Sequence, residues 1–148
     1  MKGDIYMVKL SRDFFADNEV LFMGYSSRRP AFSNSIYKAF TDAGVKVFPI
    51  NSKQNGKYDV KVYNDISELK KVPSAAYILL NTENARKAVK QIKGSGVKRI
   101  LFQPGKTADK EILDECAAAG IETAVGCPMM LFGSGLHRLH AFFTGVKR

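Results

Sequence analysis

The chain is poor in cysteine and has no long apolar run. Its two cysteines, Cys116 and Cys127, are too few for a disulfide scaffold or a metal cluster, and no Cys-x-x-Cys pair is present. No apolar stretch approaches the ~20 residues that a membrane-spanning helix needs, and residues 1–15 lack the apolar core and cleavage site of a signal peptide. We therefore expect a cytoplasmic protein without a disulfide framework.

Recognisable catalytic motifs are also absent. The sequence shows no Ser-His-acid order, no paired catalytic carboxylates and no Walker phosphate loop. His137 and His140 stand three residues apart without an evident third ligand, which disfavours a metal site. Cys127 has no charged neighbour in sequence to lower its pKa, so a small, partly buried residue is favoured over a reactive thiol. No catalytic residue is therefore assigned.

The chain has 148 residues, 45% of them hydrophobic, and a formal net charge of +9. This size suits a single domain spanning residues 1–148, with a core of its own. Charge alone cannot separate a solvated surface from a nucleic-acid patch, and we favour the solvated surface because the basic residues are scattered. They occur in short groups at Arg28–Arg29, Lys70–Lys71, Arg86–Lys90, Lys98–Arg99 and Lys147–Arg148.

Strand and helix patterns alternate along the chain. Residues 20–23 are apolar at every position, which is typical of a strand covered on both faces. With the later segments, this alternation predicts an α/β domain with a doubly wound, mainly parallel five-stranded sheet and helices on both faces. The expected strands are Val20–Met23, Val45–Ile50, Ala75–Leu80, Arg99–Phe102 and Ile121–Val125, and the main helices cover residues 32–43, 82–92 and 109–119.

The helical spacing also predicts which side chains face the core. In the first helix these are Phe32, Ile36, Phe40 and Ala43, and Gly44 ends that helix. Residues 1–19 are expected to form an N-terminal arm, and residues 131–148 a C-terminal amphipathic extension. The remaining side chains predicted to point inward are Leu10, Phe14, Phe15, Ala85, Val89, Ile92, Ile112, Leu113, Cys116, Leu136, Leu139 and Phe143.

Ligands of an open parallel sheet bind outside the carboxyl ends of its strands, where the strand order reverses. The loop from Gly24 to Pro30 stands there, between the first strand and its helix, and carries two serines and two arginines. Hydroxyls, guanidinium groups and the free amides of a helix N-terminus all suit phosphate. The motif alone fits a polar turn with surface arginines equally well. Other segments expected at this edge are Asn51–Lys53, Asn81–Thr82, Phe102–Gly105 and Gly126–Pro128.

The end of the second strand, Ile50-Asn51-Ser52-Lys53, lacks the acidic residue that usually holds the ribose of NAD. Lys46 and Lys53 would instead suit a ribose that bears an extra phosphate. Without further evidence, however, a strand lysine such as Lys46 more often extends its amino group into solvent.

Four segments, taken in order, resemble the stand-alone bacterial and archaeal CoA-binding domain family. They are Gly24–Tyr37, Gly44–Asn51, Leu101–Gly105 and Gly126–Met130, and the resemblance covers about residues 18–130. That family is similar to the N-terminal domain of the succinyl-CoA ligase alpha subunit. The resemblance implies a Rossmann-like fold that binds coenzyme A.

The resemblance also implies roles for individual residues. The loop Ser26–Arg29 would wrap the CoA phosphates, Lys46 would approach the nucleotide phosphates, and Phe102–Pro104 would line the site. Ser52 departs from the second proline that many relatives carry, and the ligase's second domain with its phosphorylated histidine is not matched. The complete expected set is Gly24, Tyr25, Ser26, Ser27, Arg28, Arg29, Ser33, Lys46, Asn51, Asn81, Phe102, Gln103 and Pro104.

Three hypotheses for function follow. The leading one is a non-catalytic binding or regulatory module for coenzyme A or acyl-CoA that works with a protein partner. The second is an enzyme that uses NADP or an acyl-CoA substrate. The third is a redox-responsive nucleic-acid binder, which is disfavoured because the nineteen residues before Val20 are too few for a winged helix.

Overall fold

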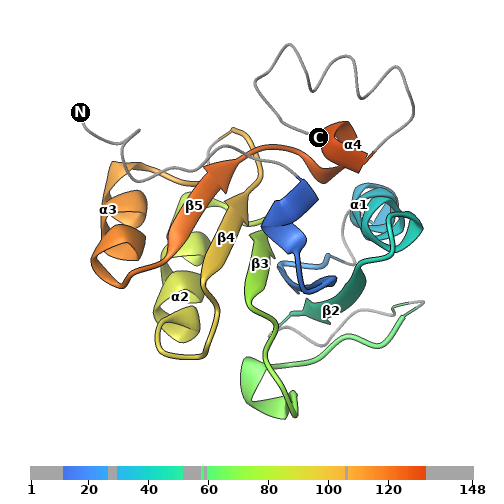
Figure 1. Ribbon diagram of the computed structural model, residues 1–148, viewed down its shortest axis with the longest axis horizontal. Coiled ribbons are helices and arrows are strands. Elements are labelled where there is room, and N and C mark those ends of the chain that lie inside the picture. The colour runs from blue at the N-terminus through green and yellow to red at the C-terminus, as the bar shows by residue number, and fades with distance from the viewer. Residues whose placement is uncertain (1–11, 27–29, 52–57, 59, 106, 133–148) are drawn as a thin grey trace.

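The computed structural model describes residues 12–26, 30–51, 58, 60–105 and 107–132 (Figure 1). Five parallel strands form one sheet in the order β2-β1-β3-β4-β5. The expectation of a Rossmann-like α/β domain is confirmed, and the sheet is parallel throughout rather than mainly so. The strands are β1 (Glu19–Met23), β2 (Lys46–Ile50), β3 (Ala75–Ile78), β4 (Arg99–Phe102) and β5 (Glu122–Val125).

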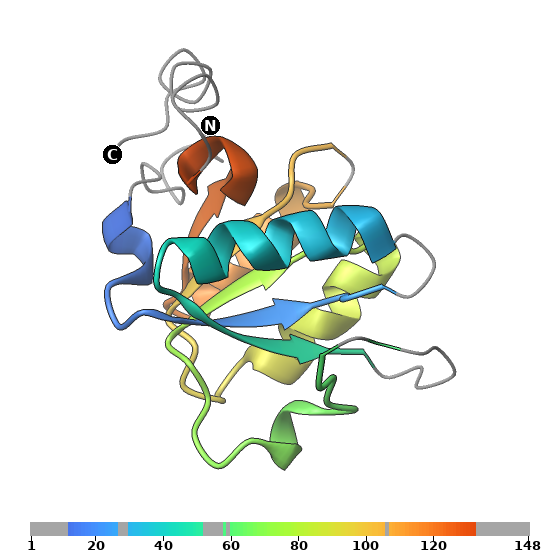
Figure 2. The ribbon, with the colours of Figure 1, turned by 90° about the vertical axis from the view of Figure 1, so that its right-hand side faces the viewer.

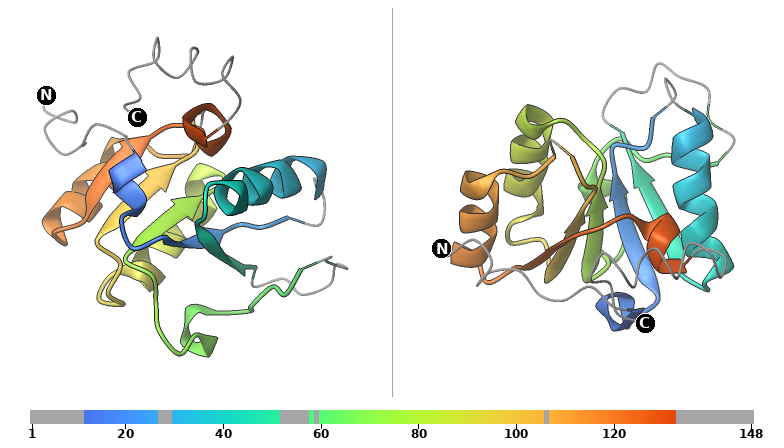
Figure 3. Two further views of the ribbon diagram at one scale, coloured as in Figure 1. Left: turned by 45° about the vertical axis from the view of Figure 1, so that its right-hand side comes forward. Right: turned by 90° about the horizontal axis from the view of Figure 1, so that it is seen from above.

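Helices cover both faces of this sheet. Seen from above in Figure 3, α1 and α4 lie on one face, and α2 and α3 lie on the other. Two short 3-10 turns, η2 before β1 and η3 before β3, complete the described elements. The helical elements are η2 (Arg12–Phe15), α1 (Pro30–Asp42), η3 (Ile66–Glu68), α2 (Thr82–Ile92), α3 (Lys110–Ala118) and α4 (Pro128–Phe132).

Strand β1 contributes side chains to the hydrophobic cores on both faces of the sheet. Val20 and Phe22 pack into the core under α1, whereas Leu21 and Met23 pack into the core under α2 and α3. None of the four is more than 4% exposed. This confirms the expectation that an uninterrupted apolar strand is covered on both faces.

The core under α1 is held together by aromatic rings. The Phe40 ring lies 5.1 Å from that of Phe15, 5.8 Å from that of Tyr77 and 5.7 Å from that of Phe132, measured between ring centroids. These contacts join α1 to η2, β3 and α4. Offset and edge-on pairs of this kind add to the stabilisation from burial.

The structure corrects the predicted buried face of α1 at its first turn. Phe32 is 37% exposed, while Ser33, Ile36 and Phe40 are fully buried. The first turn of α1, which contains Phe32, extends beyond the carboxyl end of β1 (Figure 2). The helix ends before Gly44, as expected, and Gly44 has a left-handed φ of 84°.

Two other boundaries differ from the prediction. Strand β3 ends at Ile78, so Leu79 and Leu80 form the loop that leads into α2. The segment expected to be a loop after Gly126 contains the short helix α4, which starts at Pro128. Proline suits this position because the first turn of a helix does not need its missing N–H.

The predicted buried stripe of α2 is confirmed, and a side chain caps each of the later helical segments η3, α2 and α3. Asp65 caps η3, Asn81 caps α2 and Asp109 caps α3. Phe14 and Phe15 are buried beside the sheet, but Leu113 is half-buried rather than buried. Leu10, Leu136, Leu139, Phe143, His137 and His140 lie outside the described residues.

Asp17 links the chain before β1 to the chain before β3. Its carboxylate accepts hydrogen bonds from the hydroxyl and the backbone N–H of Ser74, at 2.6 and 3.3 Å. Burial raises the pKa of Asp17, but the bonds from Ser74 and the charge of Arg99 outweigh it and leave the pKa below its ordinary value. Such a carboxylate stabilises the fold above its unfolded pKa, and this stabilisation is lost as the pH falls through the lowered pKa.

Replacing Asp17 by asparagine is therefore expected to cost about 1 kcal/mol or less at neutral pH. Urea unfolding of wild type and variant at neutral pH and at about pH 2 measures this, and the difference should disappear at the acid pH because both states then bind the proton. Ser74→Ala should behave in the same way. An equal loss at both pH values would contradict an electrostatic role for Asp17.

Candidate functional site

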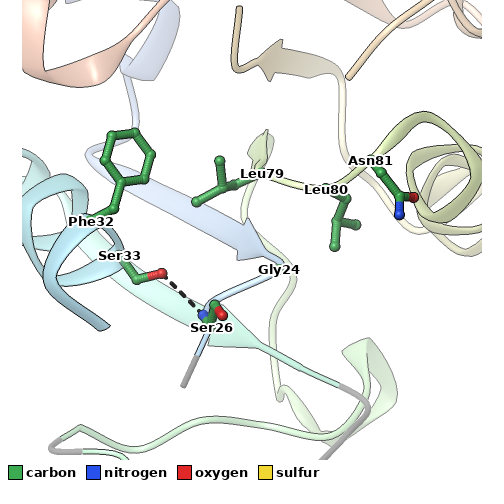
Figure 4. Close-up of a pocket in the computed structure, with 7 residues that line it drawn as sticks. All are labelled: Gly24, Ser26, Phe32, Ser33, Leu79, Leu80 and Asn81. Carbon is green, nitrogen blue, oxygen red and sulfur yellow. Dashed lines mark hydrogen bonds between the residues drawn. The ribbon is translucent and has the colours of Figure 1, made fainter. Parts of the chain in front are cut away.

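The strand order reverses between β1 and β3. From β1 the chain passes through α1 to β2 on one side, and it then crosses to β3 on the other side. A ligand crevice is expected at the carboxyl ends of such a strand pair. A pocket of about 360 Å³ lies there (Figure 4), lined by Gly24, Ser26, Phe32, Ser33, Leu79, Leu80 and Asn81.

Gly24 allows the two sides of the pocket to approach each other. Its φ is 96°, and a Cβ at this position would lie 2.2 Å from the backbone oxygen of Leu79 and 2.8 Å from Cδ2 of Leu80. Any other residue would therefore be strained and would collide with the β3–α2 loop. The glycine at this turn thus has a specific steric reason.

The loop after Gly24 is held by side chains on both of its flanks. The backbone N–H of Ser26 donates to Oγ of Ser33 at 3.1 Å, and Nδ2 of Asn51 donates to the backbone oxygen of Tyr25 at 2.7 Å. Ser33 is fully buried. Ser33 and Asn51 thus orient the loop backbone in addition to any contact with a ligand.

Tyr25 directs its side chain into the core. It is 2% exposed, its ring lies 5.2 Å from that of Phe22, and its hydroxyl donates to Oδ1 of Asn34. The backbone of Tyr25 thus belongs to the predicted loop while its ring belongs to the fold. Ser27, Arg28 and Arg29, which complete the predicted phosphate loop, lie outside the described residues.

The N-terminus of α1 opens beside this pocket. Pro30 starts the helix, and its first turn contains no acidic residue. The free N–H groups and the positive end of the dipole are therefore not neutralised by a side chain of that turn, which favours an anion there.

The sequence analysis missed the apolar wall of the pocket, which consists of Phe32, Leu79 and Leu80. Both leucines had been assigned to the strand and Phe32 to the core. The usable signal was the position of the leucines directly before the helix cap Asn81, since a capping residue requires the strand to have ended earlier.

Asn81 occupies the far side of the pocket from α1. Its Oδ1 accepts a hydrogen bond from the backbone N–H of Asn84 at 2.8 Å, which caps α2. The residue is exposed and lines the pocket, so the structure brings it together with Gly24, Ser26 and Ser33.

The predicted residues after β4 are not part of the lining of this pocket. Phe102 is fully buried under α2 and α3, and Pro104 is exposed. Gln103 accepts a hydrogen bond from the Tyr77 hydroxyl at its Oε1, 2.6 Å away. Burial raises the pKa of Tyr77 above its ordinary value, with a smaller contribution from Cys127, so the hydroxyl stays protonated as a donor.

Lys46 lies at the other end of the sheet. It is the first residue of β2 and pairs with Glu19, whereas the carboxyl end of β2 is Ile50, which pairs with Met23. Its Nζ lies 5.2 Å from the centroid of the Phe48 ring. The structure therefore does not bring Lys46 to the pocket. A contact with phosphates bound there would require a residue at the carboxyl end of β2, and Lys46 stands at its amino end.

The two cysteines differ in environment. Cys116 is fully buried, and burial, with the nearby Glu115 charge, raises the pKa of its thiol to about 12. Cys127 follows β5 and is half-buried. Within the described ranges, no three His, Cys, Asp or Glu side chains are grouped to hold a metal ion. Nor does any helix in the described part of the chain have the length and apolarity to cross a membrane.

The five-stranded parallel sheet, with a pocket at its point of reversal and a helix N-terminus beside it, defines a Rossmann-like domain of the ligand-binding type. The sequence profile of the family described as "CoA binding domain" matches residues 18–132. This chain belongs to that CoA-binding domain family, as its sequence motifs predicted. No curated protein matches it significantly.

Solved structures share the fold. A conserved hypothetical protein from Pyrococcus furiosus is 24% identical, with a TM-score of 0.63 over 73% of this chain and 92% of that one. A hypothetical protein from Pyrococcus horikoshii OT3 is 17% identical, with a TM-score of 0.69 over 98% and 94% of the two chains. A Thermus thermophilus protein is 12% identical, with a TM-score of 0.69 over 95% and 98%.

Proposed function

We propose that this protein binds coenzyme A and holds its phosphates at the turn between β1 and α1. The observation that carries the proposal is the place of the pocket. It lies where the strand order reverses, inside the matched family region and beside a helix N-terminus without an acidic first turn.

The charge of the ligand supports the same placement. Coenzyme A carries a pyrophosphate and a ribose phosphate, and the chain has a net charge of +9. Arg28 and Arg29 stand two and three residues after Ser26 in sequence. Guanidinium groups bind paired phosphate oxygens through two parallel hydrogen bonds, so these arginines are the proposed phosphate ligands.

Calorimetric titration of the full chain with coenzyme A and with dephospho-CoA tests the proposal. We expect coenzyme A to bind more tightly than dephospho-CoA. We expect the double substitution Arg28→Ala and Arg29→Ala to weaken coenzyme A binding about tenfold or more, because each lost charged hydrogen bond is worth at least ~1.5 kcal/mol. Absence of binding by the wild-type protein at millimolar coenzyme A would refute the proposal.

Lys46→Ala is the matched control, because it also removes a positive charge. Lys46 stands at the amino end of β2, and a five-residue strand spans roughly 13 Å between its first and last residues, beyond the ~8 Å over which salt screens exposed charges. The affinity for coenzyme A should therefore change by less than about twofold. A loss as large as that of the arginine variant would place the phosphates at Lys46 and contradict the site proposed here.

We propose a binding or regulatory role rather than catalysis, with either coenzyme A or an acyl-CoA as the ligand and a protein partner to receive the signal. Among the residues that the structure describes, the side chains lining the pocket include no acid, base or thiol, which supports this choice. Incubation with acetyl-CoA and with NADPH, followed by product analysis, distinguishes the enzyme hypothesis. Turnover that disappears in a pocket variant would favour the enzyme.

A nucleic-acid role is not favoured by the basic residues of α2. Arg86 forms ion pairs with Asp109 and Glu111, and Lys93 pairs with Glu115 at 2.9 Å. Asp109, Glu111 and Glu115, at the start of α3 or within it, thus neutralise much of the positive charge of Arg86 and Lys93. A gel shift with a steep salt dependence would reverse this conclusion.

A further inference from the structure

Two half-buried aromatic rings lie next to each other at the outer edge of the sheet, on the face that carries α2 and α3. Phe48 of β2 and Tyr63 both pack against the core on that face, and their ring centroids are 6.4 Å apart. Backbone hydrogen bonds fix this arrangement, because the N–H of Tyr63 donates to the Pro49 oxygen at 2.8 Å and the N–H of Asn51 donates to the Tyr63 oxygen at 2.9 Å. The two rings therefore have a defined place beside β2.

A lysine lies over each of these rings. Nζ of Lys46 is 5.2 Å from the centroid of the Phe48 ring, and Nζ of Lys61 is 4.9 Å from the centroid of the Tyr63 ring. Each lysine stands two residues before its ring in sequence, and side chains at this spacing share one face of an extended chain. These four residues form what we call the lysine–aromatic surface.

The charges of Lys46 and Lys61 are not neutralised within the described part of the chain. Both side chains are exposed, and no ion pair joins either of them to a described acidic residue, although Glu19 is the backbone partner of Lys46. Lys93 and Lys110, by contrast, each pair with a carboxylate at 2.9 Å or less. A ring attracts the ammonium group without removing its charge, so both lysines remain able to pair with an external carboxylate.

We infer that the lysine–aromatic surface binds an acidic segment of a partner protein, with carboxylates paired to Lys46 and Lys61 and apolar side chains against the exposed parts of Phe48 and Tyr63. The charge of the surface selects an acidic partner, and its aromatic residues are of the kind that protein interfaces favour. Because the rings already hold the lysines in place, less side-chain entropy is lost on binding. The inference goes beyond the proposed function and does not depend on which small ligand the pocket takes.

Single-stranded nucleic acid is another polyanion that binds basic side chains beside aromatic rings. Its bases stack on free ring faces. Here an ammonium group lies over each ring, so a stacked base would have to displace it. A carboxylate, by contrast, binds the ammonium group where it stands, and this favours the acidic protein segment.

Amide NMR titration of the full chain with a short peptide of alternating Glu and Leu, blocked at both ends, tests the inference. We expect shifts at β2 and at residues 61–63, and none with a peptide of alternating Lys and Leu. Lys46→Ala and Lys61→Ala should each weaken the acidic peptide about threefold, as expected for loss of one exposed ion pair. Lys87→Ala is the matched control, because Lys87 is an exposed lysine of α2, and it should leave the affinity unchanged.

Tyr63→Leu separates the ring from the charge. The variant keeps both lysines and an apolar side chain, but it loses the ring that holds Lys61. The acidic peptide should bind about twofold more weakly. Tyr63 is only half-buried, so the variant should fold, which a thermal melt verifies.

Three results would overturn the inference. Absence of any shift at millimolar acidic peptide is the first. The second is an equal loss for Lys87→Ala and for the two surface variants, which would attribute binding to net charge. The third is tighter binding of oligothymidylate than of the peptide, dependent on Lys46 and Lys61, which would make this a nucleic-acid surface. Lys61→Ala should retain the wild-type affinity for coenzyme A, so a failure here is distinguishable from a failure of the proposed function.

Discussion

Replacing Gly24 by alanine is expected to lower the free energy of unfolding by about 2–5 kcal/mol. The left-handed backbone at φ 96° costs a non-glycine residue roughly 1–2 kcal/mol, and the collision of the new Cβ with the Leu79 oxygen and the Leu80 side chain adds about 1–3 kcal/mol. Relief of that collision requires the β3–α2 loop to move away from β1. Urea unfolding curves measure the loss, and a calorimetric titration of the folded variant should show weakened coenzyme A binding because one wall of the pocket is displaced.

Gly44→Ala is the matched control for backbone strain. Gly44 has a similar left-handed φ of 84°, but no atom lies within 4 Å of the Cβ that alanine would add. Its replacement should therefore cost only the conformational part, about 1 kcal/mol, and should leave coenzyme A binding unchanged. Equal losses for the two variants would show that the close approach at Gly24 contributes nothing.

Replacing Phe40 by alanine is expected to lower the free energy of unfolding by about 4 kcal/mol, because truncation of a fully buried phenylalanine loses its transfer free energy and leaves a cavity. The lost ring contacts Phe15, Tyr77 and Phe132, which belong to η2, β3 and α4. Denaturant unfolding measures the effect. If the alanine variant does not fold, Phe40→Leu gives a milder loss at the same site.

Phe32→Ala is the matched control, with the same substitution in the same helix. Phe32 is 37% exposed, so its truncation should cost no more than about 1 kcal/mol of stability, while its place in the lining of the proposed coenzyme A pocket predicts a loss of affinity. Within α1, we thus expect Phe40 to contribute mainly to stability and Phe32 mainly to coenzyme A binding. A larger stability loss for Phe32→Ala than for Phe40→Ala would contradict the observed burial.

Much of the fold could be predicted because its signals are local. The uninterrupted apolar run of β1 indicated a buried parallel strand, and Asn81 and Asp109 marked helix starts through their capping side chains. The exposure of Phe32 could not be predicted from helical spacing. Spacing identifies one face of a helix, but it does not say that the first turn extends beyond the sheet.

The candidate site could also be predicted only in part. Strand-end position grouped Gly24, Ser26, Ser33 and Asn81, which line one pocket. Lys46 was placed in the site by the family resemblance, but it begins its strand, and the carboxyl ends of parallel strands meet at the opposite edge. Leu79 and Leu80 were assigned to the strand because an apolar pair can either continue a strand or line a pocket, and only the cap at Asn81 indicated that the strand ends earlier.

The most direct test of the account is an amide NMR titration of the full chain with coenzyme A. We predict the largest shifts at the backbone amides of Gly24, Ser26, Ser33 and Asn81 and at the loop that carries Arg28 and Arg29, with little change at Lys46. Shifts concentrated at the amino ends of the strands, or a spectrum that does not change at millimolar coenzyme A, would contradict a coenzyme A site at the β1–α1 turn.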